Sequence, residues 1–461
     1  MRDPRALLRL TAVIAWLLHT LPVVAADLDQ APNLRGDVGG MGPTPASHGI
    51  TLGLTETSEL LGNLSGGVRR GAEYDGLTQL SLAVDMSKAF GWPGGSFDLS
   101  ALQIHGRSLS AANLDNLQTV SGISADRSTR LWELWFQQSF LDGKADVKVG
   151  QQSLDQEFVV SQYSGLYLNT MMGWPMLPSA DLYAGGPAYP LSSLGVRLRT
   201  QPTGALTLLG GVFDDNPPGG SFADDAQRRG REAFGTRFNL NTGALVIAEL
   251  QYAIDLPAAS EAPCSGANCS LPGTYRLGAW YDTARFPDPR FDAAGRSLAD
   301  PASDGRPLEH RGNFSVYGVV DQMLWRESRG PRSVAAFARI MGAPGDRNPI
   351  DLSINAGINV KAPLPGRDDD SFGVGYGLAH VSAHLSALDR DNGLFSGLAY
   401  PVRSAEHFVE LTYQCRLVPW WIVQPDLQYI FDPGAGIPDP MQPLRRIADE
   451  LVLGVRTMVT F

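Results

Sequence analysis

Apolar and polar residues alternate with a two-residue period in many segments of this chain, and this period restricts its fold more than any other feature. In the clearest run, 350–360, apolar side chains share one face, while Asp351, Ser353, Asn355 and Asn359 share the other. Such alternation is typical of a β-strand between a polar and an apolar medium. Many runs reach the roughly 9–11 residues that a tilted strand needs to cross a bilayer, about twice the usual soluble length. We therefore predict membrane-spanning β-strands.

The segment 450–461 has the same period and ends on an aromatic residue, Phe461. One face carries apolar residues from Leu451 to Phe461, and the other carries Gly454, Arg456 and Thr460. A transmembrane β-barrel supplies both media, with water in its lumen and lipid outside. A final strand ending in Phe also resembles the recognition signal of bacterial outer-membrane proteins, which implies that Phe461 engages the barrel-assembly machinery. A soluble sheet edge is the alternative for this strand alone.

Long and short connections alternate along the chain, as in a barrel with large outer loops and small periplasmic turns. The long ones are expected at 104–129, 152–191, 214–230, 382–404 and 432–446. Counting gives about 17 candidate strands, whereas bacterial barrels have an even number. Either one candidate is false, giving sixteen, or a short strand lies in 284–312, giving eighteen. We predict an all-β, transmembrane antiparallel barrel of sixteen strands over 49–461, with eighteen as the alternative.

The N-terminus predicts secretion. Basic residues Arg2, Arg5 and Arg9 precede an apolar run at 10–21, and small residues follow at 24–26. These are the parts of a signal peptide, here 1–26, while an uncleaved anchor is the alternative. The Gly- and Pro-rich stretch 27–48 is expected to be a flexible periplasmic leader. A secreted barrel is expected in the bacterial outer membrane.

Bulk composition excludes several classes of protein. The mean hydropathy of −0.10 is too polar for a helical membrane protein, and the net charge of −11 argues against a nucleic-acid partner. Cys264 and Cys269 are close in sequence, so an oxidising periplasm favours a small loop disulfide between them. A Gly-x-Ser-x-Gly motif is absent and the seven His are scattered. We predict no enzyme, with no catalytic residues, metal or cofactor.

Several motifs resemble the carbohydrate-selective porin family (OprB-like) of Gram-negative outer membranes. They lie at 103–107, 116–122, 130–135, 149–155, 185–190 and 364–367, and the resemblance covers most of 50–461. It implies a barrel of sixteen strands that passes glucose and other neutral sugars by passive diffusion. It also implies a pore narrowed by Arg and Glu side chains, a role that falls on Arg107, Arg130 and Glu133.

A sugar pore needs side chains that replace water at sugar hydroxyls. Arg offers planar donors, carboxylates accept, and aromatic rings cover the apolar sugar faces. Binding must stay weak so that the solute leaves again. The candidates for pore lining and sugar contact are Arg69, Arg70, Arg107, Arg127, Arg130, Glu133, Asp155, Trp174, Arg197 and Arg199. The alternative for each charge is that it only solvates the lumen wall or pairs with a neighbour.

The connection 152–191 is too long for an ordinary structureless loop, so we expect a functional role. We predict that part of it folds into the barrel and narrows the channel, with the stretch 157–172 as a short helix. An outer lid or a subunit contact is the alternative.

The leading hypothesis is a porin selective for neutral mono- or oligosaccharides and surrounded by outer-membrane lipid. A general or structural barrel without sugar selectivity is the runner-up, and a soluble secreted β-protein is the third hypothesis. The sequence leaves open which sugar passes and whether the barrel is a monomer or a homo-trimer.

Overall fold

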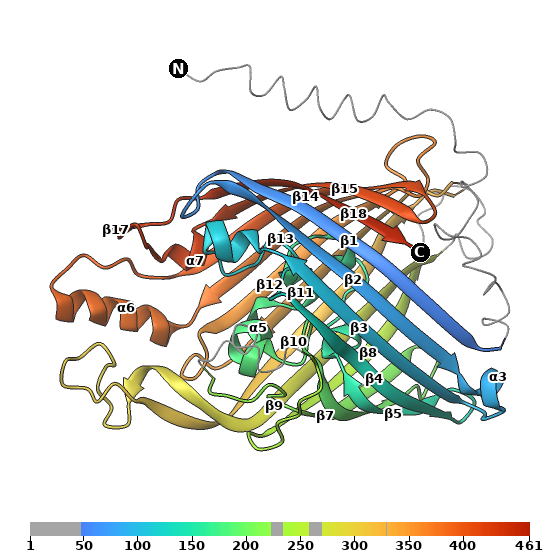
Figure 1. Cartoon of the computed structure of the whole chain (residues 1–461), viewed down its shortest axis with the longest axis horizontal. Coiled ribbons are helices and arrows are strands. Elements are labelled where there is room, and N and C mark those ends of the chain that lie inside the picture. Colours follow the sequence, from blue (N-terminus) through green and yellow to red (C-terminus); the bar gives the residue numbers. More distant parts are fainter. Residues whose placement is uncertain (1–47, 223–233, 258–269, 329) are drawn as a thin grey trace.

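The computed structural model describes residues 48–222, 234–257, 270–328 and 330–461 (Figure 1). The predicted signal peptide, the leader up to residue 47 and the predicted Cys264–Cys269 disulfide lie outside these residues. Those features stay predictions.

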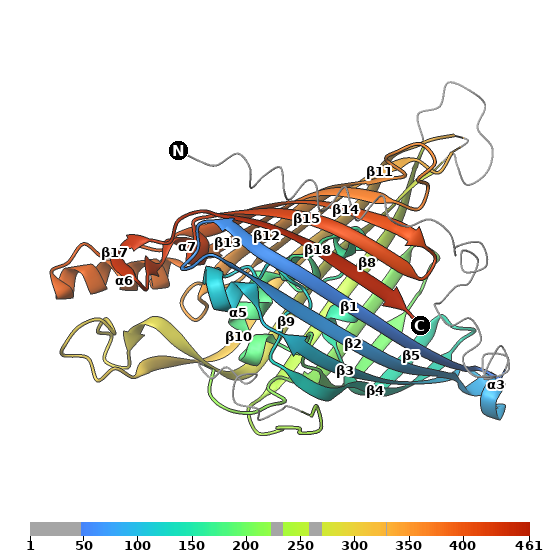
Figure 2. The same cartoon turned by 45° about the horizontal axis from the view of Figure 1, so that its top comes forward.

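Sixteen strands form one closed antiparallel barrel, in which β1 pairs with β18 (Figures 1 and 2). The prediction of sixteen strands is confirmed, and the alternative of eighteen is wrong. The barrel strands are β1 (Ile50–Ser65), β2 (Gly71–Asp85), β3 (Gly95–Gly106), β4 (Ser128–Phe140), β5 (Ala145–Gln152), β6 (Ser193–Thr200), β7 (Leu206–Asp214), β8 (Ala244–Pro257), β9 (Ser270–Asp292), β10 (Pro307–Arg326), β11 (Ser333–Gly342), β12 (Ile350–Lys361), β13 (Ser371–Val381), β14 (Ala405–Val418), β15 (Trp421–Phe431) and β18 (Glu450–Thr460).

The ambiguity at 284–312 arose because β9 and β10 extend beyond the rest of the barrel. They form a hairpin in which Pro307 pairs with Asp292, far outside the neighbouring strand ends in Figure 1. Residues 284–292 therefore continue β9 and do not form an additional strand.

Connections differ between the two ends of the barrel. At the turn end, β-strands are joined by the short segments 86–94, 141–144, 201–205, 362–370 and 419–420, and the first of these contains α3 (Met86–Phe90). At the loop end lie 107–127, 153–192, 382–404 and 432–449. These carry α6 (Ala383–Ser396), α7 (Pro433–Gly436) and the small sheet of β16 (Pro438–Asp439) and β17 (Gln442–Arg446). Short turns face the periplasm in such barrels, so the loop end is the outer end.

No helix in the described ranges is long and apolar enough to cross a membrane.

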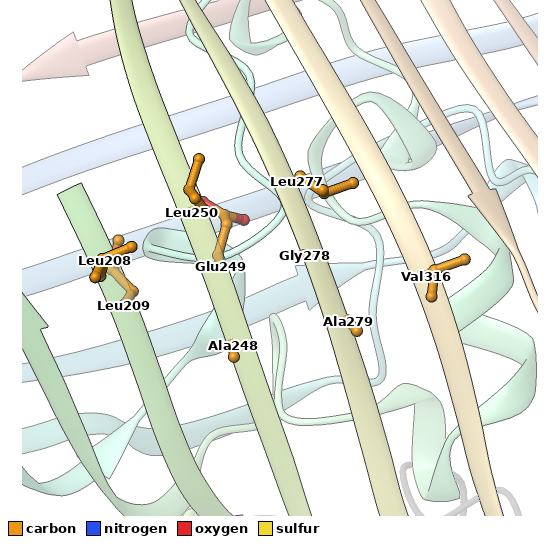
Figure 3. Close-up of a pocket in the computed structure, with 9 residues that line it drawn as sticks. All are labelled: Leu208, Leu209, Ala248, Glu249, Leu250, Leu277, Gly278, Ala279 and Val316. Carbon is orange, nitrogen blue, oxygen red and sulfur yellow. The ribbon is translucent and has the colours of Figure 1, made fainter. Parts of the chain in front are cut away.

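The alternation predicted from sequence is present on the barrel wall. Figure 3 shows a shallow depression on β7–β10, where Leu250, Leu277 and Val316 are exposed, while Leu209 and Glu249 of the same strands are buried. Leu277 is 66% exposed and Glu249 2%. Large apolar side chains standing in such a continuous surface indicate a wall that faces lipid.

The strict two-residue period is broken at Trp132. An unbroken period would place Trp132 on the lipid-facing side with Leu134, but a β-bulge lies here, since Ser100 pairs with Glu133 and Ala101 with Leu131. The extra residue changes the register, so Trp132 is buried and its ring meets Tyr189 edge-on at 6.3 Å.

Candidate functional site

The connection 153–192, hereafter the inward segment, packs inside the ring of strands. Figures 1 and 2 show its helix α5 (Met176–Asp181) within the barrel. Its apolar side chains share one buried cluster with lumen-facing residues of the wall, including Phe337 and Phe408. The segment also contains η2 (Leu154–Gln156), η3 (Ser164–Leu166), α4 (Thr170–Gly173) and η4 (Tyr183–Gly185), while η1 (Ser110–Leu114) lies in the neighbouring connection 107–127.

Buried carboxylates on the wall accept hydrogen bonds from the main chain of the inward segment. We call Glu249 on β8, Asp321 on β10 and Glu410 on β14 the docking carboxylates. Hydrogen bonds to a charged acceptor are about twice as strong as neutral ones, so each fixes a point of the segment. The N–H groups of Val159, Gln162 and Leu168 donate to Glu249, Asp321 and Glu410 over 2.8, 3.2 and 2.5 Å, respectively.

This docking explains why the predicted helix over 157–172 is wrong. A helix needs its N–H groups for carbonyls four residues earlier, but here several are committed to the wall. Val159 also adopts a positive φ of 63°, which is incompatible with a right-handed helix. Only η3 and the start of α4 are helical within this range.

Arg339 of β11 holds the same segment by its carbonyl groups. Its guanidinium is 1% exposed and also donates to Asn355 Oδ1 at 3.1 Å. A planar fork of donors suits several acceptors at once. The main-chain carbonyls of Val159, Met171, Met172 and Gly173 accept from it over 2.9, 2.6, 3.0 and 3.0 Å. The Arg339 side chain thereby joins residue 159 of the inward segment to residues 171–173.

Glycines on β13 make room for the inward segment. A Cβ at Gly375 would lie 2.6 Å from Met172 Cε and 2.7 Å from Tyr167 Cε1, and one at Gly373 would lie 2.8 Å from Leu166 Cδ2. The close approach allows the Tyr167 hydroxyl to donate to the Val374 carbonyl at 2.9 Å.

Charged side chains gather on β5, β6 and the start of the inward segment. We call Asp146, Lys148, Glu157, Arg197 and Arg199 the charge cluster. The register pairs Asp146 with Arg199, which places opposite charges side by side. It also pairs Lys148 with Arg197, two cations that share the carboxylate of Glu157.

The cluster is bonded throughout by side chains. Arg197 Nε lies 2.6 Å from Glu157 Oε2, and Arg199 Nε lies 2.8 Å from Asp146 Oδ2. Arg197 also pairs with Asp146, and Lys148 with Glu157. The Lys148 ammonium lies 4.3 Å from the centre of the Trp135 ring. Three cations thus meet two carboxylates beside an aromatic ring.

The predicted candidates separate into three groups. Arg197 and Arg199 belong to the charge cluster. Four others hold the inward segment through hydrogen bonds to its main chain. Glu133 accepts from the Ser153 N–H and Asp155 from the Tyr189 N–H, each over 3.0 Å. Trp174 donates to the Gly185 carbonyl at 2.9 Å, and Arg130 donates to the Pro190 carbonyl at 3.1 Å. Burial raises the pKa of the Asp155 carboxyl.

The third group stands at the loop end of the barrel. Arg69, Arg70, Arg107 and Arg127 are exposed there. Arg69 donates to the Ala112 carbonyl at 2.7 Å, Arg127 to the Gly106 carbonyl at 2.6 Å, and Arg107 lies 3.5 Å from Glu73.

Our candidate set lacked Asp146, Lys148, Glu157, Arg339 and the docking carboxylates. For Asp146 and Lys148 a signal existed, because they alternate with Ala145, Val147 and Val149 as lumen-facing residues should. Arg339 was also visible as a single charge within an apolar run, 334–341.

Comparison with known proteins agrees with this architecture. Residues 69–461 match the family described as "Carbohydrate-selective porin, OprB family". The chain is 26% identical to Porin B of Pseudomonas aeruginosa, over 94% of this chain and 92% of the relative. It is 23% identical to the putative porin QuiX of Acinetobacter baylyi, over 93% of each chain.

A solved structure has the same fold. The high-pH structure of Pseudomonas putida OprB superposes with a TM-score of 0.79 at 23% identity, covering 94% of this chain and 99% of that one. The chain belongs to the OprB family of carbohydrate-selective porins and is therefore an outer-membrane channel rather than an enzyme.

Proposed function

We propose that the channel passes neutral sugars, glucose among them, by passive diffusion, and that the charge cluster and the inward segment form its narrowest part. The observation that carries this is the charge cluster itself, where cations and carboxylates balance to within one charge next to Trp135. A nearly balanced set of donors and acceptors favours a neutral polar solute over an ion of either sign.

The chemistry of the cluster suits a sugar hydroxyl. Arg199 and Glu157 keep 36% and 19% of their side-chain surface exposed, so a donor and an acceptor remain within reach of the lumen. The Trp135 ring offers a flat apolar surface for a sugar face. Each contact is weak and exchanges with water, which permits release, and a millimolar site needs only about 4 kcal/mol.

The remaining partners follow from the barrel as proposals. The apolar outer wall is expected to contact outer-membrane lipid, and Phe461 to engage the barrel-assembly machinery. Association into a homo-trimer also stays a prediction.

The test is swelling of proteoliposomes. Glucose should enter faster than a zwitterionic amino acid of similar size, because the latter has full charges to desolvate at the constriction. Equal rates would reduce the channel to a general porin, and absence of both swelling and ion conductance would favour a structural barrel.

A further inference from the structure

A polar cavity of about 420 Å³ lies between the inward segment and the wall at the turn end. Its wall residues come from strand ends: Ser333 begins β11, Lys361 ends β12 and Ser371 begins β13. The inward segment contributes Gln162, Tyr163, Gly165 and Leu166. The volume is within the roughly 300–1,000 Å³ that small-molecule sites occupy.

The lining has the chemistry of a site for a neutral polyol. It combines the amides of Gln162 and Gln414 with the hydroxyls of Ser333 and Ser371 and the phenol ring of Tyr163. Amides and hydroxyls both donate and accept, as sugar hydroxyls do. Among the residues that the structure describes, no Asp or Glu lines the cavity, and its cation, Lys361, donates to the Asp369 carbonyl at 2.7 Å.

The site is held rigid by the docking of the inward segment. Asn359 donates to the Tyr163 carbonyl at 2.6 Å and accepts from the Tyr167 hydroxyl at 2.8 Å. Gln424 of β15 donates to the Leu166 carbonyl at 2.6 Å. The two sides of the cavity are therefore joined by direct hydrogen bonds, and little ordering is left for a ligand to bring about.

Ser371 and Gln414 occupy one register pair of β13 and β14, so their side chains meet on the same wall. Tyr163 and Gln162 approach from the inward segment. A sugar ring between them would have polar partners on the wall and an aromatic face on the other side.

We propose that this cavity is a second binding site for a neutral sugar, on a different part of the wall from the charge cluster. The inference rests on the proposed function, because it takes the same solute as given. The charge cluster also lies towards the turn end, since Asp146 is near the start of β5 and Arg199 near the end of β6. A second weak site at this end offers a solute new polar partners before it returns fully to water, as multi-site conduction requires. The charge cluster lies on β5 and β6, so the two sites are built by different strands.

The experiment measures block of the ion current by glucose in planar bilayers. Gln414→Leu removes an amide from the cavity and leaves every docking hydrogen bond in place. Gln79→Leu in β2, outside the cavity, makes the same change as a matched control. We expect Gln414→Leu to raise the half-blocking glucose concentration about tenfold, equivalent to about 1.4 kcal/mol, whereas Gln79→Leu leaves it unchanged.

A second variant guards against misfolding. Tyr163→Leu removes the ring from the other side of the cavity and should raise the half-blocking concentration in the same direction. Folding of each variant is checked by heat-modifiable migration in gels.

The outcomes separate the two claims. If wild-type protein is neither permeated nor blocked by glucose, the proposed function fails, and this inference fails with it. If wild-type protein passes and is blocked by glucose, but folded Gln414→Leu and Tyr163→Leu match Gln79→Leu, the second site alone is overturned.

Discussion

Carboxylates serve two different purposes in two parts of this barrel. On β8, β10 and β14, the docking carboxylates accept main-chain N–H groups of the inward segment. Glu249 and Asp321 are fully buried there, and Asp321 also pairs with Arg276 at 2.6 Å. On β5 and in the inward segment, Asp146 and Glu157 pair with side-chain cations in the charge cluster. The same residue type thus acts as an anchor in one region and as a pore group in the other.

The two kinds of carboxylate differ in how freely their hydrogen-bonding partners can move. A main-chain N–H of the segment cannot leave its carboxylate without displacing the segment and exposing a buried charge. The Arg199–Asp146 pair, in which the Arg199 side chain is 36% exposed, contributes little to stability, and Arg199 can exchange its partner for water or a solute. Substitutions in the two regions should therefore separate folding from permeation.

The largest effect is expected where the inward segment is held by one side chain. Arg339→Met leaves several main-chain carbonyls of the segment without a donor and should cost about 3–5 kcal/mol locally. We expect the segment to leave its position, which raises single-channel conductance and abolishes discrimination between glucose and larger sugars. Conductance in planar bilayers measures this, with Arg390→Met on the exposed face of α6 as the control. Unchanged conductance in the folded variant would contradict the assignment of Arg339 as an anchor.

A smaller effect of the same kind is expected from the glycines. Gly375→Ala places a methyl group against Met172 and Tyr167, and such overpacking typically costs about 1–3 kcal/mol. The thermal midpoint should fall and conductance should become heterogeneous. Gly204→Ala is the matched control, because nothing lies near its Cβ position. Equal midpoints for the two variants would mean that the segment adjusts without strain.

A substitution in the charge cluster should change ion selectivity and leave stability nearly unchanged. Arg199→Gln removes a cation whose partner, Asp146, keeps Arg197, so stability should change by less than about 1 kcal/mol. Ion selectivity should shift towards cations, since one positive charge is lost from the lumen. Reversal potentials in a salt gradient measure this shift, and Arg445→Gln on β17 is the control. A fall in stability without a change in selectivity would place Arg199 among the anchors.

The smallest effect concerns Asp370, a turn residue that has both kinds of partner. It accepts from the Arg367 guanidinium at 2.8 Å and from the Arg416 N–H at 3.0 Å. Burial alone raises the pKa of its carboxyl, but hydrogen bonds from Arg367, Tyr413 and Arg416 outweigh burial and hold the pKa below its ordinary value.

The sign of the pH effect follows from this lowered pKa. The stabilisation is present above the unfolded pKa of about 3.9 and is lost as pH falls through the folded pKa. The difference in thermal midpoint between wild type and Asp370→Asn should be largest near neutral pH and shrink in acid. Circular dichroism melts across this range measure it, and a difference independent of pH would show that Asp370 acts only through its shape.

Much of the fold was predictable from local sequence, because polar and apolar residues alternate in each strand according to the water on one side and the lipid on the other. The period in 350–360 needs no knowledge of neighbouring strands, and β12 follows it with Ile358 outside and Asn355 inside. The strand count was harder, since the β9–β10 hairpin continues the same period beyond the membrane. The bulge at Trp132 was invisible, because it depends on the pairing of β4 with β3.

The candidate site was predictable only in part. Arg197 and Arg199 were predicted as lumen residues because they stand on the polar face of a strand. Arg107 and Arg127 are also arginines, but they lie at the loop end and outside the charge cluster. Glu157 and Asp146 come together with Arg197 only when the start of the inward segment reaches β5 and β6. Contacts between residues that are distant in sequence produce no periodic pattern in a single sequence.

By itself, the sequence determined a closed sheet between water and lipid, because the side-chain period reports the medium on each side of every strand. Only the tertiary structure decided which charges anchor the inward segment and which can serve the channel. That distinction depends on partners distant in sequence, such as Leu168 with Glu410, and on how deeply each pair is buried.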